Sequence, residues 1–374
     1  MGKNQVLKSL MEKSVATNLN ATSTLPLDIK SKNEIYKEVA DNGKTGMSLK
    51  LSQTYAYAKM LMKFYKSGVS NVWNNNKQYK LLKNQQFKIN SVVGGKDTDI
   101  KLPNFVKLTH HMSQMLFINK IENERGNSGI KDHSKGDFQI TPKLFNLSRG
   151  EYQLIKRTPK DFMKLPMFAI IFAIFVEMTP IICYAIPQVT PSTCVLPSIE
   201  PRIWNSAYNR EIQKSVDEEN LFSQSTKTAY NLPLNQVQNL CKALNLVSKY
   251  IPSKLYPESV LRDRLQNHFN YLSVDNYYLS GLNGNGNINN LSFQELLNAC
   301  LERNLIIDLK EEMSKFDKID NEVDKQKIQN ELMIDLKGKL TRFIIDFQNS
   351  NIGYLTITNN LPPVDSSKLQ QYRN

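Results

Sequence analysis

The stretch Leu165–Pro187, LPMFAIIFAIFVEMTPIICYAIP, is a long apolar run, and the expected fold follows from it. Pro166–Ile186 comprises 21 residues without Lys, Arg, Asp or Asn, and would be roughly 31 Å long as a helix. That length matches the hydrocarbon core of a bilayer, so residues 165–187 are predicted to form one transmembrane helix starting at Pro166. The alternative is a buried helix of a soluble protein in which the one acidic residue is paired.

That acidic residue is Glu177, the twelfth of the 21 residues and therefore near the expected middle of the membrane. An ionisable group at that depth is costly, and its presence usually reflects function or a partner. Pro180 is expected to kink the helix nearby, because proline removes an intrahelical hydrogen bond. Glu177 and Pro180 are thus the candidate site for handling a cation or proton, and helix pairing is the alternative role of Glu177.

Charge is distributed unevenly along the chain. Residues 1–164 contain 28 Lys and Arg against 13 Asp and Glu, net +15, whereas residues 165–374 contain 20 and 22, net −2. A basic half of this kind is expected to meet anionic lipid headgroups or nucleic acid, or to contain an import signal. An excess of solvated surface lysines is the alternative.

Nothing in the sequence indicates catalysis. The cysteines and histidines have neither a CxxC pair nor metal-ligand spacing (Cys183, Cys194, Cys241, Cys300, His110, His111, His133 and His268). Gly284-x-Gly286 lacks the GK[ST] of a phosphate loop and the closing Glu of a calcium loop. We therefore expect reduced thiols, no metal, no cofactor and no enzyme activity.

The first 27 residues contain a single acidic residue, Glu12. Val6, Leu7 and Leu10 share one helical face, and the lysines lie largely away from it. This pattern predicts a mitochondrial transit peptide over residues 1–27, with a surface helix or disordered N-terminus as the alternative.

The remaining periodicity is helical. Helices are predicted over residues 51–73, 105–121, 234–246, 260–272, 292–303 and 324–347. Ser148-x-x-Glu151 is a capping box that starts another helix at Ser148, and Ser292-x-x-Glu295 is a second capping box, at the start of the helix over 292–303. Residues 74–86 and the region of Asp97 and Asp99 are expected to be irregular. The predicted class is all-α, a single transmembrane helix followed by an all-helical C-terminal domain. The expected order is transit peptide 1–27, basic helical region 28–146, basic helix leading into the membrane 147–164, transmembrane helix 165–187, proline-containing linker 188–230, helical domain 231–348 and polar tail 349–374.

Several segments resemble the mitochondrial leucine-zipper/EF-hand transmembrane (LETM-like) family. The strongest block lies around the apolar run and comprises Leu147, Ser148, Arg149, Glu151, Arg157, Asp161, Pro166, Phe168, Glu177 and Pro180. Weaker matches downstream include Leu261–Leu265, Asp275, Leu291–Leu296 and Ala299–Arg303. Gly150 replaces a second Arg of the family, and no EF-hand or leucine zipper follows, so the chain is similar to a short, divergent fungal-type member.

The resemblance implies a single-pass protein of the mitochondrial inner membrane with its C-terminal, ribosome-binding-type domain (231–348) in the matrix. It implies potassium/proton exchange, control of matrix volume and binding of the mitochondrial ribosome. The expected function is therefore cation homeostasis with ribosome binding. The alternative is a membrane tether for ribosomes or translation factors that transports nothing.

One membrane helix cannot enclose an ion path, so a homo- or hetero-oligomer in the membrane is expected. The basic residues near 149–164 are expected to contact anionic headgroups, and DNA is not among the expected partners. Ser148, Arg149, Glu151, Arg157, Asp161 and Pro166 are the predicted motif at the start of the membrane segment.

Overall fold

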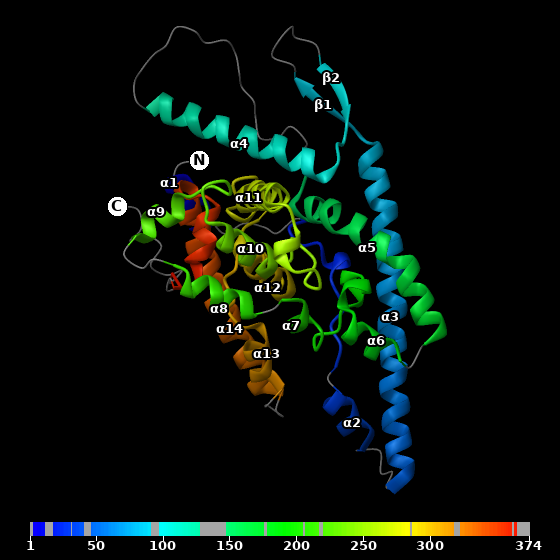
Figure 1. The fold of residues 1–374 in the computed structure, drawn as a ribbon. Coiled ribbons are helices and arrows are strands. Elements are labelled where there is room, and N and C mark those ends of the chain that lie inside the picture. The colour runs from blue at the N-terminus through cyan, green and yellow to red at the C-terminus, as the bar shows by residue number, and fades with distance from the viewer. Residues whose placement is uncertain are drawn as a thin grey trace. The chain divides into compact units, whose positions relative to one another are not determined.

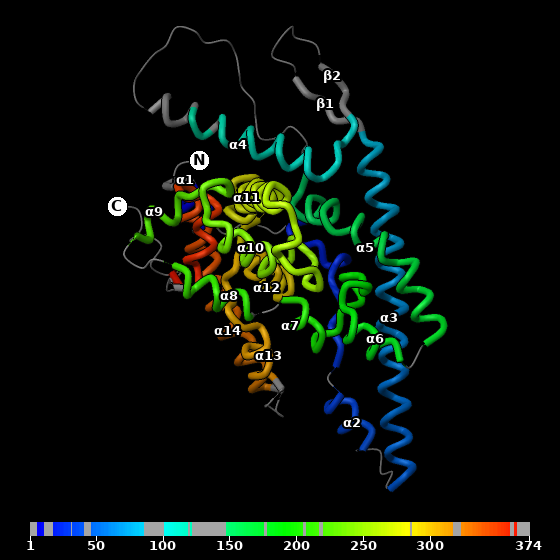
Figure 2. Tube along the Cα trace, viewed as in Figure 1, coloured from blue at the N-terminus to red at the C-terminus, as the bar shows by residue number. Residues whose placement is uncertain are grey.

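The computed structural model describes residues 3–11, 18–30, 32–40, 46–90, 97–127, 147–175, 178–204, 206–216, 220–284, 286–317, 322–360 and 363–364. The remaining residues are grey in Figure 2. The described helices are α1 Lys3–Met11, α2 Lys32–Ala40, α3 Gly46–Asn84, α4 Phe105–Asn127, α5 Arg149–Ile174, α6 Thr179–Ala185, α7 Glu200–Ile203, α8 Ser206–Lys214, α9 Leu221–Thr226, α10 Leu234–Ala243, α11 Glu258–Leu279, α12 Phe293–Leu301, α13 Leu309–Asp317 and α14 Glu322–Asp346, with short 3-10 turns between them (Figure 1). The predicted helical class is confirmed.

One antiparallel hairpin departs from the helical pattern. β1 (Gln86–Asn90) pairs with β2 (Asp97–Lys101), with Gln86 opposite Lys101 and Asn90 opposite Asp97. Residues 74–86 and the region of Asp97 and Asp99 were expected to be irregular, which is wrong for Asp97 and Asp99 because they lie in β2. α3 instead continues to Asn84, and its polar end is anchored because Asn75 donates from Nδ2 to the Ser23 carbonyl at 2.8 Å.

The chain divides into two compact units. Unit 1 comprises residues 1–20, 83–152 and 204–374, and unit 2 comprises residues 21–82 and 153–203. In unit 1, α11 packs against α4 and α10, while α12 packs against α14. Leu261, Leu265 and Leu272 of α11 are completely buried, which makes this helix the centre of the unit 1 core. The apolar face of α1 (Val6, Leu7 and Leu10) is buried as well, and the transit peptide over 1–27 stays a prediction.

Unit 2 is built from α2, α3, most of α5, α6 and α7. Its core brings α3 against the second half of α5 and the segment that follows α6, through Leu61, Phe64, Tyr65, Phe168, Cys183, Cys194, Val195, Leu196 and Ile199. Aromatic rings fill the centre: Tyr65 and Phe168 lie 5.8 Å apart between centroids, and Phe168 stacks on Phe172 at 6.4 Å.

The prediction of a continuous helix over 165–187 is wrong. α5 starts at Arg149, runs through Pro159 and Pro166, and ends at Ile174, and a separate helix, α6, starts at Thr179. Among the helices of the described ranges, none combines the length and the apolar character needed to cross a membrane. The described helices therefore give no support to the predicted transmembrane helix over 165–187.

Candidate functional site

The second half of α5 and the following helix, α6, expose an unusual amount of apolar surface. Nine large apolar side chains between residues 163 and 186 are exposed: Met163, Met167, Ile170, Ile174, Phe175, Met178, Ile181, Tyr184 and Ile186. The first four are spaced four, three and four residues apart, which places them on one narrow face of α5. Ile170 is 60% exposed and Ile174 is 66% exposed. We call these nine residues the apolar stripe.

The opposite face of α5 is buried in the core of unit 2. Leu165 and Phe168 are buried there, and Phe172 packs against the same cluster. Both faces of this helix segment are therefore apolar, but one is covered by the protein and the other is not. Isolated exposed apolar residues are normal on a protein surface, whereas a helix face of exposed large apolar residues, such as Met163, Met167, Ile170 and Ile174, is typical of a contact with lipid or another protein.

Polar contacts fix the segment that follows α6 against α5. Asp161 accepts hydrogen bonds from the backbone N–H of Ser192 at 2.9 Å and from its hydroxyl at 3.0 Å. Lys164 donates to the Thr190 carbonyl at 3.0 Å. Burial raises the pKa of Asp161 and lowers the pKa of Lys164, although each is opposed by the charge of the other. These groups hold the residues 190–194 in place and so support the fold that presents the stripe.

α3 approaches this segment closely at Gly68. Thr193 donates to the Gly68 carbonyl at 2.9 Å, and a Cβ at position 68 would lie 2.5 Å from Cys194 Sγ and 2.8 Å from the Thr193 carbonyl oxygen. We expect Gly68→Ala to lower the free energy of unfolding by about 1 to 3 kcal/mol, because the backbone must shift to accept the methyl group. Chemical denaturation measures the change, with Ser70→Ala on the exposed surface of α3 as control. Equal effects of the two substitutions would contradict this packing.

The predicted ion-handling site does not receive support from the fold. Glu177 lies outside the described residues. Pro180 occupies the first turn of α6, where its missing N–H costs little, and not the middle of a long helix. Pro166 lies inside α5 rather than at its start. Arg157 donates to the Thr24 hydroxyl at 3.0 Å.

The predicted capping box is confirmed at the start of α5. The Glu151 carboxylate accepts from the Ser148 backbone N–H at 2.8 Å and from its hydroxyl at 2.9 Å, and the Glu151 N–H donates to Ser148 Oγ at 3.2 Å. Arg149, expected to meet lipid headgroups, is instead completely buried in unit 1. That expectation is wrong for Arg149, because its guanidinium forms ion pairs with buried carboxylates in the core of unit 1.

Arg149 is part of a buried ionic cluster that we define as Arg149, Asp275, Glu295 and Arg303, all of which have fully buried side chains. Arg149 Nε lies 2.8 Å from Asp275 Oδ1, and its Nη1 lies 3.1 Å from Glu295 Oε2. Arg303 Nη2 contacts Asp275 Oδ2 at 2.7 Å. Burial alone would raise the pKa of Asp275, but the two guanidinium groups hold that pKa well below its usual range. Two cations and two anions compensate one another, so the cluster fits a structural role.

Glu295 shows how this cluster changes the second predicted capping box. Ser292 caps α12 as expected, since its hydroxyl accepts from the Glu295 N–H at 3.4 Å. The Glu295 side chain, however, points to Arg149, and the Ser292 N–H donates to Asn20 Oδ1 at 3.0 Å. The ion pair in the core thus replaces the second half of the box.

Basic residues accompany the apolar stripe in unit 2. This unit contains fifteen Lys and Arg against seven Asp and Glu, a net charge of +8. Lys59, Lys63 and Lys160 are exposed. At the end of α6, the Arg202 guanidinium lies 4.0 Å from the centre of the Tyr184 ring and donates to the Tyr184 carbonyl at 2.8 Å. An aromatic ring paired with an arginine is typical of the boundary between lipid and water.

Unit 2 also contains a carboxylic acid with a shifted pKa. Burial raises the pKa of Glu200, the first residue of α7, to about 7 from 4.5. The folded state therefore binds this proton more tightly than the unfolded chain does. The contribution of Glu200 to the free energy of unfolding is fully present below about pH 4.5 and is lost as the pH rises through about 7. We expect Glu200→Gln to raise the free energy of unfolding by roughly 1 to 3 kcal/mol at about pH 8 and to change it little at about pH 4.5.

Urea denaturation at the two pH values tests this effect. Glu211→Gln, at an exposed position of α8, is the control. A stabilisation by Glu200→Gln that is the same at both pH values would show that the carboxyl group does not titrate as described.

Four free cysteines are buried: Cys183, Cys194, Cys241 and Cys300. Burial raises the thiol pKa of Cys194, Cys241 and Cys300 to about 12. In the described part of the chain, no group of three His, Cys, Asp or Glu side chains is arranged to hold a metal ion. The site is thus defined by an apolar surface and its basic surroundings.

The sequence model of the pentamidine resistance factor domain matches residues 19–281, well over half of the chain. The chain belongs to this family. The pentamidine resistance factor of Saccharomyces cerevisiae, a mitochondrial protein, is 24% identical over 308 residues, which cover 78% of this chain and 68% of that protein. No solved structure matches the chain. The location of this relative supports the mitochondrial location expected from residues 1–27.

Membership of the pentamidine resistance factor family overturns the resemblance to the LETM-like family. Potassium/proton exchange with ribosome binding was therefore a wrong prediction, and the alternative of a ribosome tether is not favoured either. Five of the residues that suggested the resemblance have structural roles. Ser148 and Glu151 cap a helix, and Arg149, Asp275 and Arg303 pair in the core. Such devices recur in unrelated helical proteins.

The sequence also contained a signal for the apolar stripe that the transmembrane interpretation concealed. Met163, Met167, Ile170 and Ile174 follow helical spacing, and so do Leu165, Phe168 and Phe172 on the other face. Because both faces of this helix are apolar, the sequence shows an uninterrupted apolar run, which is also the pattern of a transmembrane helix. Which face the protein covers depends on α3, and this could not be inferred from the run itself.

Proposed function

We propose that this chain is a non-enzymatic mitochondrial protein that binds the surface of an anionic membrane through the apolar stripe. The observation that carries the proposal is the exposure of nine large apolar side chains within residues 163–186. Each large apolar side chain moved from water into an apolar phase contributes about 1.5 to 3 kcal/mol when fully buried. A few of them suffice for stable attachment.

The length of the stripe favours a helix that lies in the membrane surface. From Met163 to Ile174 the rise is roughly 17 Å, about half of the hydrocarbon thickness of a bilayer. Helices of this kind bury one face to a shallow depth at the boundary of headgroups and acyl chains. The second face of α5 is already buried against α3, so the segment would enter lipid as part of a folded unit.

The net charge of unit 2 favours anionic lipid over a neutral surface. Its charge is +8, and each basic residue close to an anionic membrane contributes about 1 kcal/mol. Lys160 lies within α5 itself and is exposed, so it can reach headgroups when the stripe is buried. Cardiolipin, an anionic lipid, is a suitable probe.

We assign no catalysis to the chain. The side chains of the buried ionic cluster are inaccessible to a substrate and form ion pairs with one another, which fits a role in stability and not in catalysis. The relative is named for resistance to pentamidine, and we extend that phenotype to this chain as part of the proposal. Cells that express a variant with a disrupted stripe should then respond to pentamidine like cells that lack the chain.

Flotation of the purified protein with vesicles tests membrane binding directly. We expect it to float with vesicles of phosphatidylcholine and cardiolipin, to float less with phosphatidylcholine alone, and to bind less at high salt. Absence from the vesicle fraction under all conditions would overturn the proposal. So would a stripe occupied by a second copy of the chain, detected as a stable dimer in solution that does not bind vesicles.

A further inference from the structure

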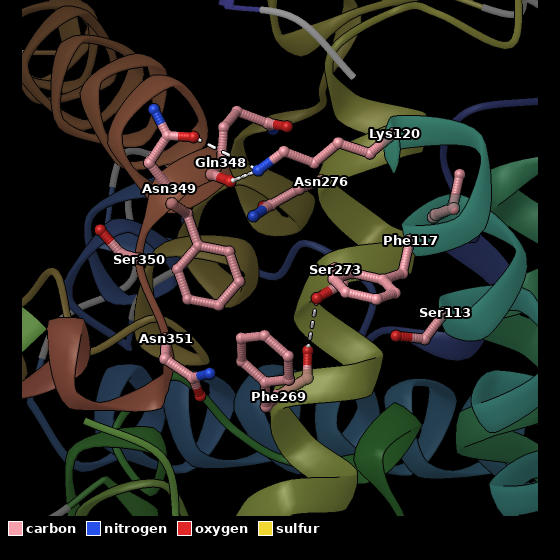
Figure 3. Close-up of a pocket in the computed structure, with 12 residues that line it drawn as sticks. Ser113, Phe117, Lys120, Phe269, Ser273, Asn276, Gln348, Asn349, Ser350 and Asn351 are labelled. Carbon is pink, nitrogen blue, oxygen red and sulfur yellow. Dashed lines mark hydrogen bonds between the residues drawn. The ribbon is translucent and has the colours of Figure 1, made fainter. Parts of the chain in front are cut away.

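A cavity of about 430 Å³ lies within unit 1, between α4, α11 and the segment after α14 (Figure 3). Its volume is within the range of small-molecule sites in proteins. α4 contributes Phe117 and Lys120, α11 contributes Phe269 and Asn276, and residues 347–351 close the third side. It belongs to unit 1 only and plays no part in the proposed attachment to membranes.

Aromatic rings form the walls of this cavity. Phe269 and Phe347 lie 5.4 Å apart between centroids with an angle of 44° between their planes. Phe117 also borders the cavity and is 62% exposed, although it is a large apolar residue. The exposed Phe117 ring borders the same cavity as the half-buried Phe269 and the buried Phe347, and a flat apolar ligand can pack there because aromatic pairs add a specific attraction to the burial of area.

Asn276, at the edge of the same cavity, has a side-chain amide whose nitrogen lacks a hydrogen-bond partner among the described residues. Asn276 is buried, and its Oδ1 accepts from Arg303 Nε at 3.1 Å and from Nη2 at 2.8 Å. A guanidinium only donates, so the amide oxygen must face Arg303 and Nδ2 must face away from it. Nδ2 has no hydrogen-bond partner among the described residues. A buried donor without a partner is costly, and an acceptor on a ligand would satisfy it.

Lys120 supplies positive charge at the same end of the cavity as Asn276 (Figure 3). Its ammonium donates to the Gln348 carbonyl at 2.7 Å and to Asn349 Oδ1 at 3.3 Å, and an ammonium has three hydrogens to donate. The residues that border the cavity include no Asp or Glu. A cationic ligand would therefore meet a like charge, whereas an anionic one would be attracted.

We propose that this cavity binds a small aromatic carboxylate, with its ring against Phe117 and Phe269 and its carboxylate accepting from Asn276 Nδ2 and Lys120 Nζ. The aromatic walls select a flat ring, and the two donors select an anionic acceptor. The site differs from the apolar stripe in both chemistry and location, so either can exist without the other.

Calorimetric titration of the full chain with 2-naphthoate tests the proposal, with 2-naphthylmethylamine as a probe of the same ring and opposite charge. We expect saturable binding of the carboxylate and binding of the amine that is at least roughly tenfold weaker. Equal affinity for the two probes, or no saturable binding of the carboxylate, would overturn the proposal.

Two substitutions near the protein surface locate the site without disturbing the core. Phe117→Ala and Lys120→Met should each weaken 2-naphthoate binding by roughly tenfold. The matched controls on α4 are Val106→Ala, at a side chain that is 51% exposed, and Lys107→Met, and neither residue borders the cavity. Loss of affinity in the controls equal to that in the two variants would place binding elsewhere and contradict the assignment.

Discussion

Replacement of Arg149 by Met should lower the free energy of unfolding by about 3 to 5 kcal/mol, the usual effect of removing one partner from a buried ion pair. The guanidinium donates to Asp275 at 2.8 Å and to Glu295 at 3.1 Å, and all three side chains are completely buried. Without it, Glu295 and Asp275 each lose a buried ion pair. Unfolding by guanidinium chloride, followed by circular dichroism, measures the change.

The control for this prediction is an ion pair on the surface. Arg210 contacts Asp308 at 2.9 Å, but its side chain is largely exposed, so Arg210→Met should change stability by less than about 1 kcal/mol. If Arg149→Met were as mild as the control, the buried ionic cluster would not stabilise unit 1. Acid should act in the same direction as Arg149→Met: the pKa of Asp275 is held below its usual range, so its contribution is lost as the pH falls.

Replacement of Ile170 and Ile174 together by Asn should weaken binding to cardiolipin-containing vesicles by roughly 30- to 150-fold. Two isoleucines that are partly buried in lipid account for about 2 to 3 kcal/mol in total, and each 1.4 kcal/mol corresponds to a factor of ten. Both side chains point away from the core of unit 2, so the fold should be retained. Flotation over a series of lipid concentrations gives the partition coefficient.

The matched control is Ile334→Asn on α14 in unit 1, where the isoleucine is 71% exposed but stands outside the apolar stripe. It should leave vesicle binding unchanged. Equal loss of binding in the control and in the double variant would mean that general surface polarity determines binding. Unchanged binding in the double variant would place the membrane contact elsewhere.

Helices with a regular apolar period were predictable from the sequence. α14 (Glu322–Asp346) was expected over 324–347, and α4 and α11 began within two residues of the expected positions. α3 was expected to end at residue 73, because a polar, Asn-rich stretch follows. It continues to Asn84, and the amide of Asn75 finds a carbonyl of a distant segment. That contact depends on tertiary structure and has no local signal.

The buried ionic cluster shows the same limit. Arg149, Asp275, Glu295 and Arg303 all belong to motifs that stood out in the sequence, but nothing in their spacing indicated that they would meet. Arg149 and Glu295 are 146 residues apart along the chain. The cavity beside Asn276 is formed by three separate segments and likewise could not be predicted from the sequence. The exposure of Phe117 beside the cavity is an indication of a binding site, but this exposure is known only from the structure.

The most direct test of the central claim is a fluorescent probe on the apolar stripe. The native cysteines are buried and their thiol pKa values are raised, so an environment-sensitive dye should label Ile170→Cys selectively. On addition of cardiolipin-containing vesicles, we predict a blue shift of the emission and quenching by brominated acyl chains, with neither effect for the same dye at Ile334→Cys. A dye at position 170 whose emission is unaffected by vesicles that the protein binds would contradict attachment through the stripe.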